Sequence, residues 1–333
     1  TPPPPPPPTR HGVRRQRQMC IRDSVHSPGL AAQDDFFSTI NVDTQSNGDN
    51  DSVIDVIGWI SAKAAYGLEE PDSIFSRSDA EFSSIETSIF LQTDWHASEN
   101  INFRFSGEFF HDAIYSINNN TDYSERERSK YRNRFQVRDF YLENQVNDNL
   151  YVRFGNQILA WGYAEYLRVT DIINIENQFT LGQQDLEDLR LQVPALLTSL
   201  SVDDWVFDWV VTYRAGRNWL APEGDEFDQF IPFRYSNGIL DRQSPKNQLE
   251  YFFRASTSYH SGDIQLIAGE FNNNALTLGS IDRPRSVSPI IAFGQERLQA
   301  AGVAMNYVTG PWLVFGELGV HRNSPTFPNL NEV

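Results

Sequence analysis

The sequence predicts an all-β protein, an antiparallel up-and-down transmembrane β-barrel of which about eleven strands are visible. Three observations lead to this fold class. Apolar and polar residues alternate with a period of two, as where Leu150, Val152 and Phe154 alternate with Tyr151 and Arg153. Long and short polar connections alternate along the chain, and aromatic residues stand beside the short ones. A wall with water inside and hydrocarbon outside accounts for all three.

The clearest element is a hairpin at residues 137–157, whose two strands each carry one apolar and one charged face. The residues between them, 147–149, are Asn, Asp and Asn, which tolerate tight turns. Counting back from this turn places Glu143 roughly diagonal to Arg153, within pairing distance on neighbouring strands. A soluble sheet would show the same alternation, so the connections must decide between the two.

The other expected strands follow from the same alternation. They lie at residues 53–66, 84–95, 101–112, 189–201, 205–214, 250–260, 264–271, 297–307 and 312–320, with an ambiguous register in 264–271 and 297–307. Short links at 96–100, 203–204, 261–263 and 309–311 alternate with long polar loops. Bacterial outer-membrane barrels segregate turns and loops in this way, whereas a sandwich or propeller has no reason to do so.

Aromatic residues beside the short links predict a girdle at the membrane interface, where an apolar ring meets a wet edge. They are Trp95, Tyr151, Trp205, Tyr259, Tyr307 and Trp312. Aromatic residues are common in all strands, so it is their position at one end that favours the girdle.

Composition narrows the function. The chain has 333 residues, 40% of them hydrophobic, and a net charge of −17, so clustered Lys and Arg for nucleic acid are not expected. No run of eighteen apolar residues occurs, which leaves no candidate for a membrane-spanning helix. Cys20 is the single cysteine, so we expect neither a disulfide framework nor a cysteine-based metal site.

The two ends of the chain are unlike the middle. Residues 1–24 are rich in proline and then arginine, and we interpret them as a disordered, adaptor-derived, non-native segment, with a basic arm as the alternative. Residues 25–51 are expected to hold the remnant of a signal peptide and the start of the mature protein. Residues 52–333 are expected to form the barrel, incomplete at its C-terminal side because the strand count is odd.

The predicted water-facing wall carries charged and polar side chains that line a lumen. They are Lys63, Glu86, Arg104, Glu108, Asp139, Glu143, Arg153, Gln157, Asp208, Arg214, Glu250, Arg254, His260 and Glu317. Opposite charges across a lumen set the field that a solute experiences. The alternative is that these charges only pair with one another and brace the barrel.

The loop after the central hairpin is strongly acidic. Its acids are Glu165, Asp171, Glu176, Asp185, Glu187 and Asp188. No spacing selects a catalytic pair of carboxylates, so we expect no enzyme, no metal and no cofactor. Two structures remain open for it: a solvated acidic loop, or a loop that folds inward and narrows the pore. The candidate constriction residues are Trp161, Gly162, Glu165, Asp171 and Asn174.

The stretch RFGNQILAWGYAEYLRVTD resembles a family of proteobacterial outer-membrane barrels catalogued as domain of unknown function 1302. That family shows an Arg-x-Gly-x-Gln strand, then Trp-Gly, then an Asp-x-x-Asn-like segment. The matching positions are Arg153, Gly155, Gln157, Trp161, Gly162, Asp171 and Asn174, while Ile175 stands where the family often has proline. The resemblance implies an outer-membrane location and a role in lipid or hydrophobic-solute export, and supplies no catalytic residues.

The resulting hypothesis is an outer-membrane barrel that acts as a porin-like channel or as a transport or export component for small or lipid-like solutes. Its expected partners are outer-membrane lipid and, for export, periplasmic or inner-membrane transport components. The alternatives are an outer-membrane binding protein or enzyme that uses the acidic loop 161–188, and a soluble carbohydrate-binding β-sandwich.

Overall fold

A computed structural model describes residues 53–66, 82–117, 125–164, 168–180, 186–213, 216–221, 227–230, 239–242, 248–282 and 290–322. All of these belong to one unit, Ser52–Val333. The expectations for residues 1–51 and for Glu165, Asp185 and Arg214 lie outside the described residues.

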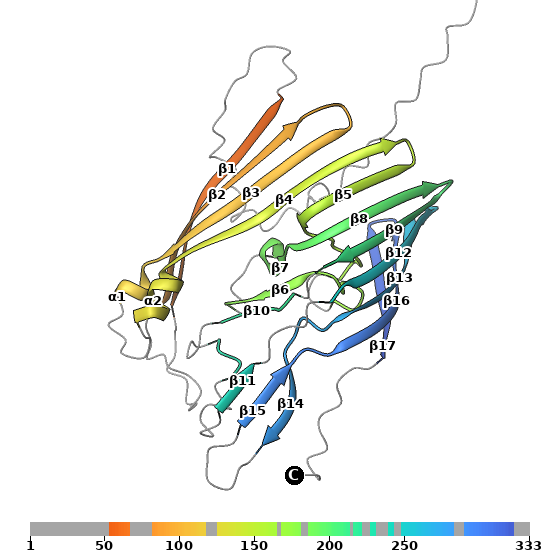
Figure 1. Cartoon of the computed structure of the whole chain (residues 1–333). Helices are drawn as coiled ribbons and strands as arrows, with labels where there is room; N and C mark the ends of the chain where they lie inside the picture. The colour runs from red at the N-terminus through yellow and green to blue at the C-terminus, as the bar shows by residue number, and fades with distance from the viewer. Residues whose placement is uncertain are drawn as a thin grey trace, which may run out of the picture. The chain divides into compact units, whose positions relative to one another are not determined.

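One antiparallel sheet of eleven strands dominates this unit, in the order β1-β2-β3-β4-β5-β8-β9-β12-β13-β16-β17 (Figure 1). The strands are β1 Ile54–Tyr66, β2 Phe82–His96, β3 Ile101–Asp112, β4 Asn133–Asn147, β5 Leu150–Gln157, β8 Val193–Val202, β9 Trp205–Thr212, β12 Glu250–Tyr259, β13 Gly262–Asn272, β16 Arg297–Thr309 and β17 Trp312–Arg322. Consecutive large strands are sheet neighbours, so the predicted all-β, up-and-down architecture is confirmed. The sandwich alternative is wrong, because the main strands form one sheet and not two facing sheets.

The predicted alternation of short and long connections is also confirmed. Tight turns join β2 to β3, β4 to β5, β8 to β9, β12 to β13 and β16 to β17, and long segments make the other connections. Three turn residues have positive φ, namely Asp203 at 52°, His260 at 47° and Gly310 at 57°. His260 therefore lies in an exposed turn and not on a strand face, which corrects its assignment to the lumen wall.

The long connections contain short elements that the alternation did not predict. They are α1 Ile114–Ile117, α2 Glu125–Arg132, the 3-10 helix η1 Leu186–Leu189, β6 Ile175–Gln178, β7 Arg190–Leu191, β10 Trp219–Leu220, β11 Ile239–Arg242, β14 Thr277–Asp282 and β15 Ile290–Gly294. The six short strands among them form two small sheets, β10-β6-β7 and β11-β15-β14. No helix in the described part of the chain is both long and apolar enough to cross a membrane.

The strand register fixes how far the strands tilt. A row of directly paired residues runs from Ile54 at the turn end of β1, through Trp95, Phe154 and Tyr251, to Arg322 at the far end of β17. The row begins at the turn end of β1 and reaches β17 ten residues beyond its turn end at Trp312. Over ten strand steps this is a shift of about one residue per strand. With strands about 4.8 Å apart and a rise of about 3.4 Å per residue, this slope is a tilt of about 35°. Transmembrane barrels have strand tilts in this range.

The two faces of the sheet differ. We call the face that bears Phe154 and Leu318 the outer face and the face that bears Arg153 and Glu317 the inner face. Large apolar side chains on every strand of the outer face are exposed. They include Ile60, Ile89, Phe105, Phe140, Phe154, Leu196, Trp209, Tyr251, Leu266, Met305 and Leu318.

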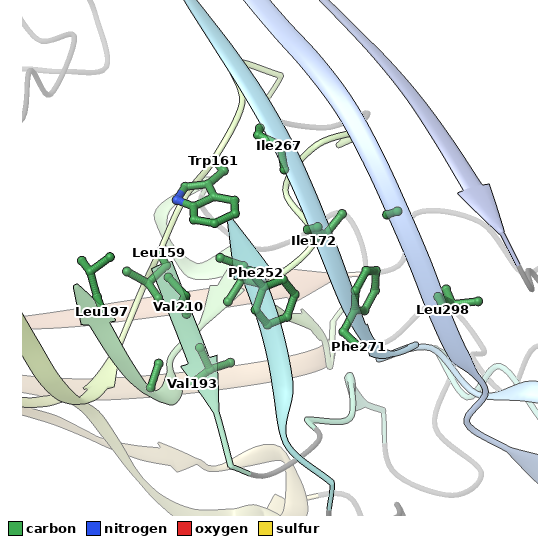
Figure 2. Close-up of a cluster of buried hydrophobic side chains, with 13 residues drawn as sticks. Leu159, Trp161, Ile172, Val193, Leu197, Val210, Phe252, Ile267, Phe271 and Leu298 are labelled. Atoms are coloured by element: carbon green, nitrogen blue, oxygen red, sulfur yellow. The ribbon is translucent and has the colours of Figure 1, made fainter. Parts of the chain in front are cut away.

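The inner face is not charged throughout. From β8 to β16 it carries buried apolar residues that pack against Leu159, Trp161, Ile172 and Ile173 of the segment after β5 (Figure 2). On the sheet side the cluster consists of Val193, Ala195, Leu197, Val210, Phe252, Ile267, Phe271, Leu298 and Ala300. In this part of the inner face the covering segment takes the place of water, so the inner positions are apolar between the predicted polar residues.

Candidate functional site

The candidate site is formed by the segment that follows β5 and crosses the inner face. We call residues 158–174 the inner loop; 158–164 and 168–174 are described. Trp161 meets the ring of Phe252 on β12 edge-on at 6.4 Å, and the Gly162 N–H donates to Gln265 on β13 at 3.3 Å. At its far point the loop reaches Glu317 on β17, six strands from β5 in the sheet order. The loop therefore spans more than half of the sheet.

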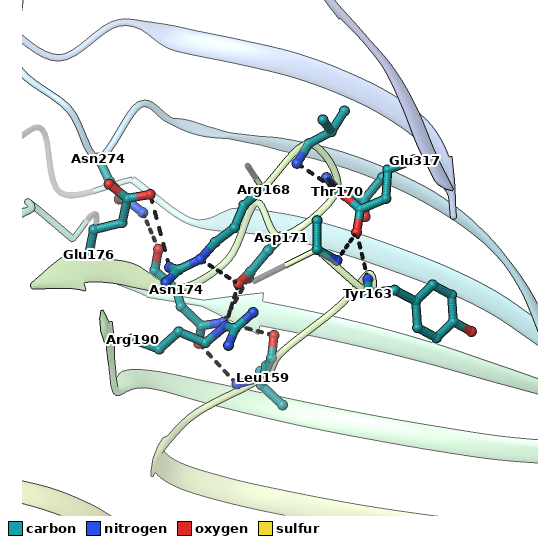
Figure 3. Close-up of polar contacts among 12 residues, drawn as sticks. Leu159, Tyr163, Arg168, Thr170, Asp171, Asn174, Glu176, Arg190, Asn274 and Glu317 are labelled. Atoms are coloured by element: carbon teal, nitrogen blue, oxygen red, sulfur yellow. Dashed lines mark hydrogen bonds and ion pairs between the residues drawn. The ribbon is translucent and has the colours of Figure 1, made fainter. Parts of the chain in front are cut away.

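The base of the inner loop is closed by Asn174, which is buried. Its Oδ1 accepts the N–H of Leu159 at 3.0 Å, and its Nδ2 donates to the Leu159 carbonyl at 3.0 Å. The same Nδ2 donates to Asp171 Oδ1 at 2.9 Å. Asn274, after β13, donates to the Asn174 carbonyl at 3.1 Å. The Asp-x-x-Asn segment thus ties both ends of the loop together (Figure 3).

An ion pair fixes the same region to β7. Arg190 Nε donates to Asp171 Oδ2 at 2.6 Å, and the Asp171 side chain is 2% exposed. Burial raises the pKa of the Asp171 carboxyl, and Arg190 opposes this effect. Arg168 lies 4.0 Å from both Asp171 and Glu176, and burial together with the nearby Arg190 lowers its pKa. Asp171 and Glu176 are therefore engaged in ion pairs.

The tip of the inner loop is bound by Glu317. Its Oε1 accepts the backbone N–H groups of Tyr163 at 2.5 Å and Ala164 at 2.7 Å. Its Oε2 accepts those of Val169 at 3.1 Å and Thr170 at 3.0 Å (Figure 3).

Gly162 makes this approach possible. Its φ is +85°, and a Cβ there would lie 2.3 Å from Thr170 Oγ1 and 2.5 Å from Glu317 Oε1. A side chain at this position would therefore both strain the backbone and separate the loop from β17.

Each named residue of the Arg-x-Gly-x-Gln strand has a structural role. Arg153 pairs with Glu143, and Gly155 has a φ of +136° with the backbone of Phe140 so close that a Cβ would lie 2.2 Å from its carbonyl oxygen. Gln157 is fully buried and donates to the Ala195 carbonyl at 3.0 Å. These residues join β5 to both of its neighbours.

Ion pairs cover the inner face from β2 to β5. Arg104 donates to Asp94 through two nitrogens, at 2.6 and 3.0 Å. Arg153 Nη2 donates to Glu143 at 3.0 Å, and its Nε donates to the Tyr151 hydroxyl at 2.7 Å. The register puts Glu143 directly opposite Arg153, closer than the diagonal position inferred from the turn.

Two further arginines, which the sequence reasoning did not select, hold loop segments to the wall. Arg138 on β4 pairs with Glu108 on β3 and, at 2.6 Å, with Asp188 of η1. Arg134 pairs with Glu86 and places its guanidinium 4.1 Å from the centre of the Phe179 ring. Arg138 was missed because a register shift in the β3–β4 pairing interrupts the simple alternation, and Arg134 was missed because β4 begins at Asn133, before the expected hairpin.

The other end of the inner face holds a smaller network. Arg254 Nε donates to Asp208 at 2.8 Å. Glu250 accepts the Thr212 hydroxyl at 2.6 Å, and the backbone and side-chain N–H groups of Asn272 at 2.9 and 3.0 Å. These carboxylates have partners on neighbouring strands.

The described residues place most of the predicted wall on the inner face. Those found there are Lys63, Glu86, Arg104, Glu108, Asp139, Glu143, Arg153, Gln157, Asp208, Glu250, Arg254 and Glu317. Trp161, Gly162, Asp171 and Asn174 lie together in the inner loop, on the face that Glu317 also occupies.

The aromatic girdle needs one correction and one addition. Tyr151 points to the inner face, where its hydroxyl donates to Glu143 at 2.5 Å, so it is not a girdle residue. Trp95, Trp205, Tyr259, Tyr307 and Trp312 are exposed. A second exposed aromatic band, unforeseen from the sequence, lies at the opposite ends of the strands. It consists of Tyr66, Phe82, Phe135, Tyr213 and Tyr251.

Fold and site together define an up-and-down antiparallel β-protein with an exposed apolar outer face and an inner face crossed by a loop. Residues 75–212 match the model of the family described as "Protein of unknown function (DUF1302)". The resemblance drawn from the Arg-x-Gly-x-Gln and Trp-Gly residues is therefore confirmed, because those residues lie within the matched stretch.

Two solved structures are similar at low identity. OmpF of Salmonella typhi, in complex with daunomycin, is 11% identical; the match covers 81% of this chain and 66% of that chain, with a TM-score of 0.38. OmpT, an outer membrane protein of Vibrio cholerae in its in-vitro folded trimer form, is 8% identical; the match covers 80% and 88%, with a TM-score of 0.22. No curated protein matches the sequence.

Proposed function

We propose that this protein is an outer-membrane β-barrel that acts as a porin-like channel or transport component, narrowed by the inner loop. The observation that carries the proposal is the outer face. Each of its strands exposes large apolar side chains, and exposed aromatic bands stand at both ends of the strands. This is the pattern of a wall that faces hydrocarbon between two lipid–water interfaces.

The size of the apolar face supports lipid as its partner. Soluble monomers rarely expose a contiguous apolar patch above a few hundred Å² (~300–600). Here the exposed apolar residues continue from β1, with Ile60 at 68%, to β17, with Leu318 at 69%. Water would be a poor solvent for such a face, and lipid a good one.

The inner face supports a polar passage beside β1 to β5. The apolar part of this face, from β8 to β16, is covered by the inner loop, whereas Arg104, Asp94, Glu143 and Arg153 remain partly exposed. Water and a small polar solute would meet both signs of charge there. Since Asp171 and Glu176 are engaged in ion pairs, we propose transport and not catalysis for the acidic loop.

A closed barrel is the second candidate. It is favoured by the tight apolar packing of Trp161 and Ile173, two residues of the inner loop that are 2% and 3% exposed. In that case the ion pairs brace the wall and no solute passes.

Two measurements test the proposal. Spin labels at Phe105 and Ile89 should report a hydrocarbon environment in liposomes, and the folded protein should migrate differently from the boiled protein on detergent gels. Ion conductance in a planar bilayer then separates the channel from the closed barrel. Labels that report a dry protein interior in a freely dissolving monomer would contradict the membrane assignment.

A further inference from the structure

Three glycines of the sheet, on β13, β16 and β17, lie directly beneath the inner loop. A Cβ at Gly269 on β13 would lie 2.9 Å from Ile172 Cδ1, and one at Gly302 on β16 would lie 2.9 Å from Thr170 Cγ2. A Cβ at Gly319 on β17 would lie 2.8 Å from Val169 Cγ1. We call these three positions the glycine bed. They let the loop lie flat on the wall, but they contribute no side chain that would grip it.

The grip at this end comes from Glu317. Its two oxygens each accept two N–H groups, and all four donors belong to the loop backbone. Hydrogen bonds to an ionised acceptor are the stronger kind. Because the donors are backbone groups, the attachment by Glu317 does not depend on which side chains the tip carries.

We propose that Glu317 is a latch that holds the tip of the inner loop on the glycine bed. When its hydrogen bonds are lost, residues 162–164 and 168–170 leave β16 and β17, while Asn174 and Arg190 still hold the two ends of the loop together. The released tip then projects into the passage along the inner face and narrows it. The narrowing rests on the proposed channel function, whereas the release of the tip does not.

The release is tested by thiol labelling. Thr170 is 1% exposed, so a cysteine there is protected while the tip is seated. Thr170→Cys is placed in a Cys20→Ser background, which removes the single cysteine of the sequence. A water-soluble maleimide is added to the folded protein in detergent. Glu317→Gln should raise the labelling rate at least about tenfold, because local opening limits access to a buried site.

Glutamine is a sharp replacement for this purpose. It keeps the size of the side chain but offers one acceptor oxygen, and it turns an NH₂ group toward two N–H donors. Asp148→Asn, in the β4–β5 turn, is the matched control that removes one carboxylate elsewhere and should leave the rate unchanged. The baseline is the labelling rate of the Thr170→Cys protein that keeps Glu317. If Glu317→Gln labels no faster than this baseline, the latch is overturned.

A second variant guards against a folding defect. Gly319→Val keeps the carboxylate but fills the bed under Val169, so it should also raise the labelling rate of Thr170→Cys. Variants are compared only in the heat-modifiable, folded fraction. If neither variant exposes the thiol, the latch is wrong.

Conductance separates the latch from the channel proposal. Glu317→Gln should decrease single-channel conductance in a planar bilayer, because the released tip obstructs the passage, while Asp148→Asn should leave the conductance unchanged. Faster labelling in Glu317→Gln, with no conductance in any variant or in the wild type, would support the latch and contradict the channel proposal. Conductance in the wild type, with an unchanged labelling rate in Glu317→Gln, would support the channel proposal and contradict the latch.

Discussion

The side-chain amide of Asn174 pairs with the backbone of Leu159 on both of its hydrogen-bonding groups, each at 3.0 Å. The pairing imitates the contact of a neighbouring strand and closes a loop whose two ends would otherwise separate. Asn174→Ala should therefore lower the local stability of the loop base by about 1–3 kcal/mol, because it leaves a buried N–H and C=O unpaired. Hydrogen exchange at the Leu159 amide should accelerate accordingly. Asn149→Ala in the β4–β5 turn is the control, and unchanged exchange in Asn174→Ala would contradict the assignment.

The Glu143–Arg153 pair predicts a non-additive pair of substitutions. The two side chains are 24% and 17% exposed, so Arg153→Ala should cost about 2 kcal/mol by leaving Glu143 and Tyr151 without their cation. Adding Glu143→Gln should recover part of this loss, since the unpaired charge is then removed. The midpoint temperature of the gel-mobility shift measures both effects. Strict additivity would show that the two groups do not interact.

The backbone at Gly155, on β5, requires a residue without a side chain. Gly155→Ala would place a Cβ 2.2 Å from the Phe140 carbonyl oxygen at a φ of +136°. We expect a destabilisation of more than about 3 kcal/mol and a large loss of heat-modifiable protein. Gly316→Ala is the matched control on β17, because a Cβ there meets nothing within 4 Å. Similar yields of the two variants would argue against the close approach.

If the outer face meets lipid, a charged side chain introduced there should destabilise the protein in a bilayer. Phe154 is 63% exposed, so Phe154→Arg makes little difference to packing in water. In a bilayer the same change should cost about 2–4 kcal/mol if the position lies near the midplane. Refolding yields into liposomes, compared with Asp148→Arg at the turn, measure this cost. Equal yields would mean that this face does not meet hydrocarbon.

Much of the sheet could be predicted because the two faces of a strand meet different environments. Apolar and polar residues therefore alternate along the strand with a period of two. The limits of β3, Ile101–Asp112, and the turn at Asn147 agree with the expectation from alternation. The registers of β13 and β16 were ambiguous because their inner positions are apolar or small, as at Ile267, Ala300 and Ala304, so the two faces look alike.

The candidate site was less accessible to such reasoning. Glu317 was expected to face a lumen, but its four loop amides could not be foreseen, since backbone donors leave no trace in a sequence. Arg138 and Asp188 are fifty residues apart and come together only through the fold. The inward course of the loop was a possibility suggested by its position, and the contacts of Trp161 now describe its path.

The sequence by itself determined the eleven large strands, their order and which face of each strand is exposed and apolar, because period-two patterning and tight turns act between near neighbours in the chain. Only the tertiary structure decided which inner positions are covered and which charges meet. Those contacts depend on register accumulated over eleven strands and on a loop that reaches from β5 to β17, distances over which no local pattern carries information.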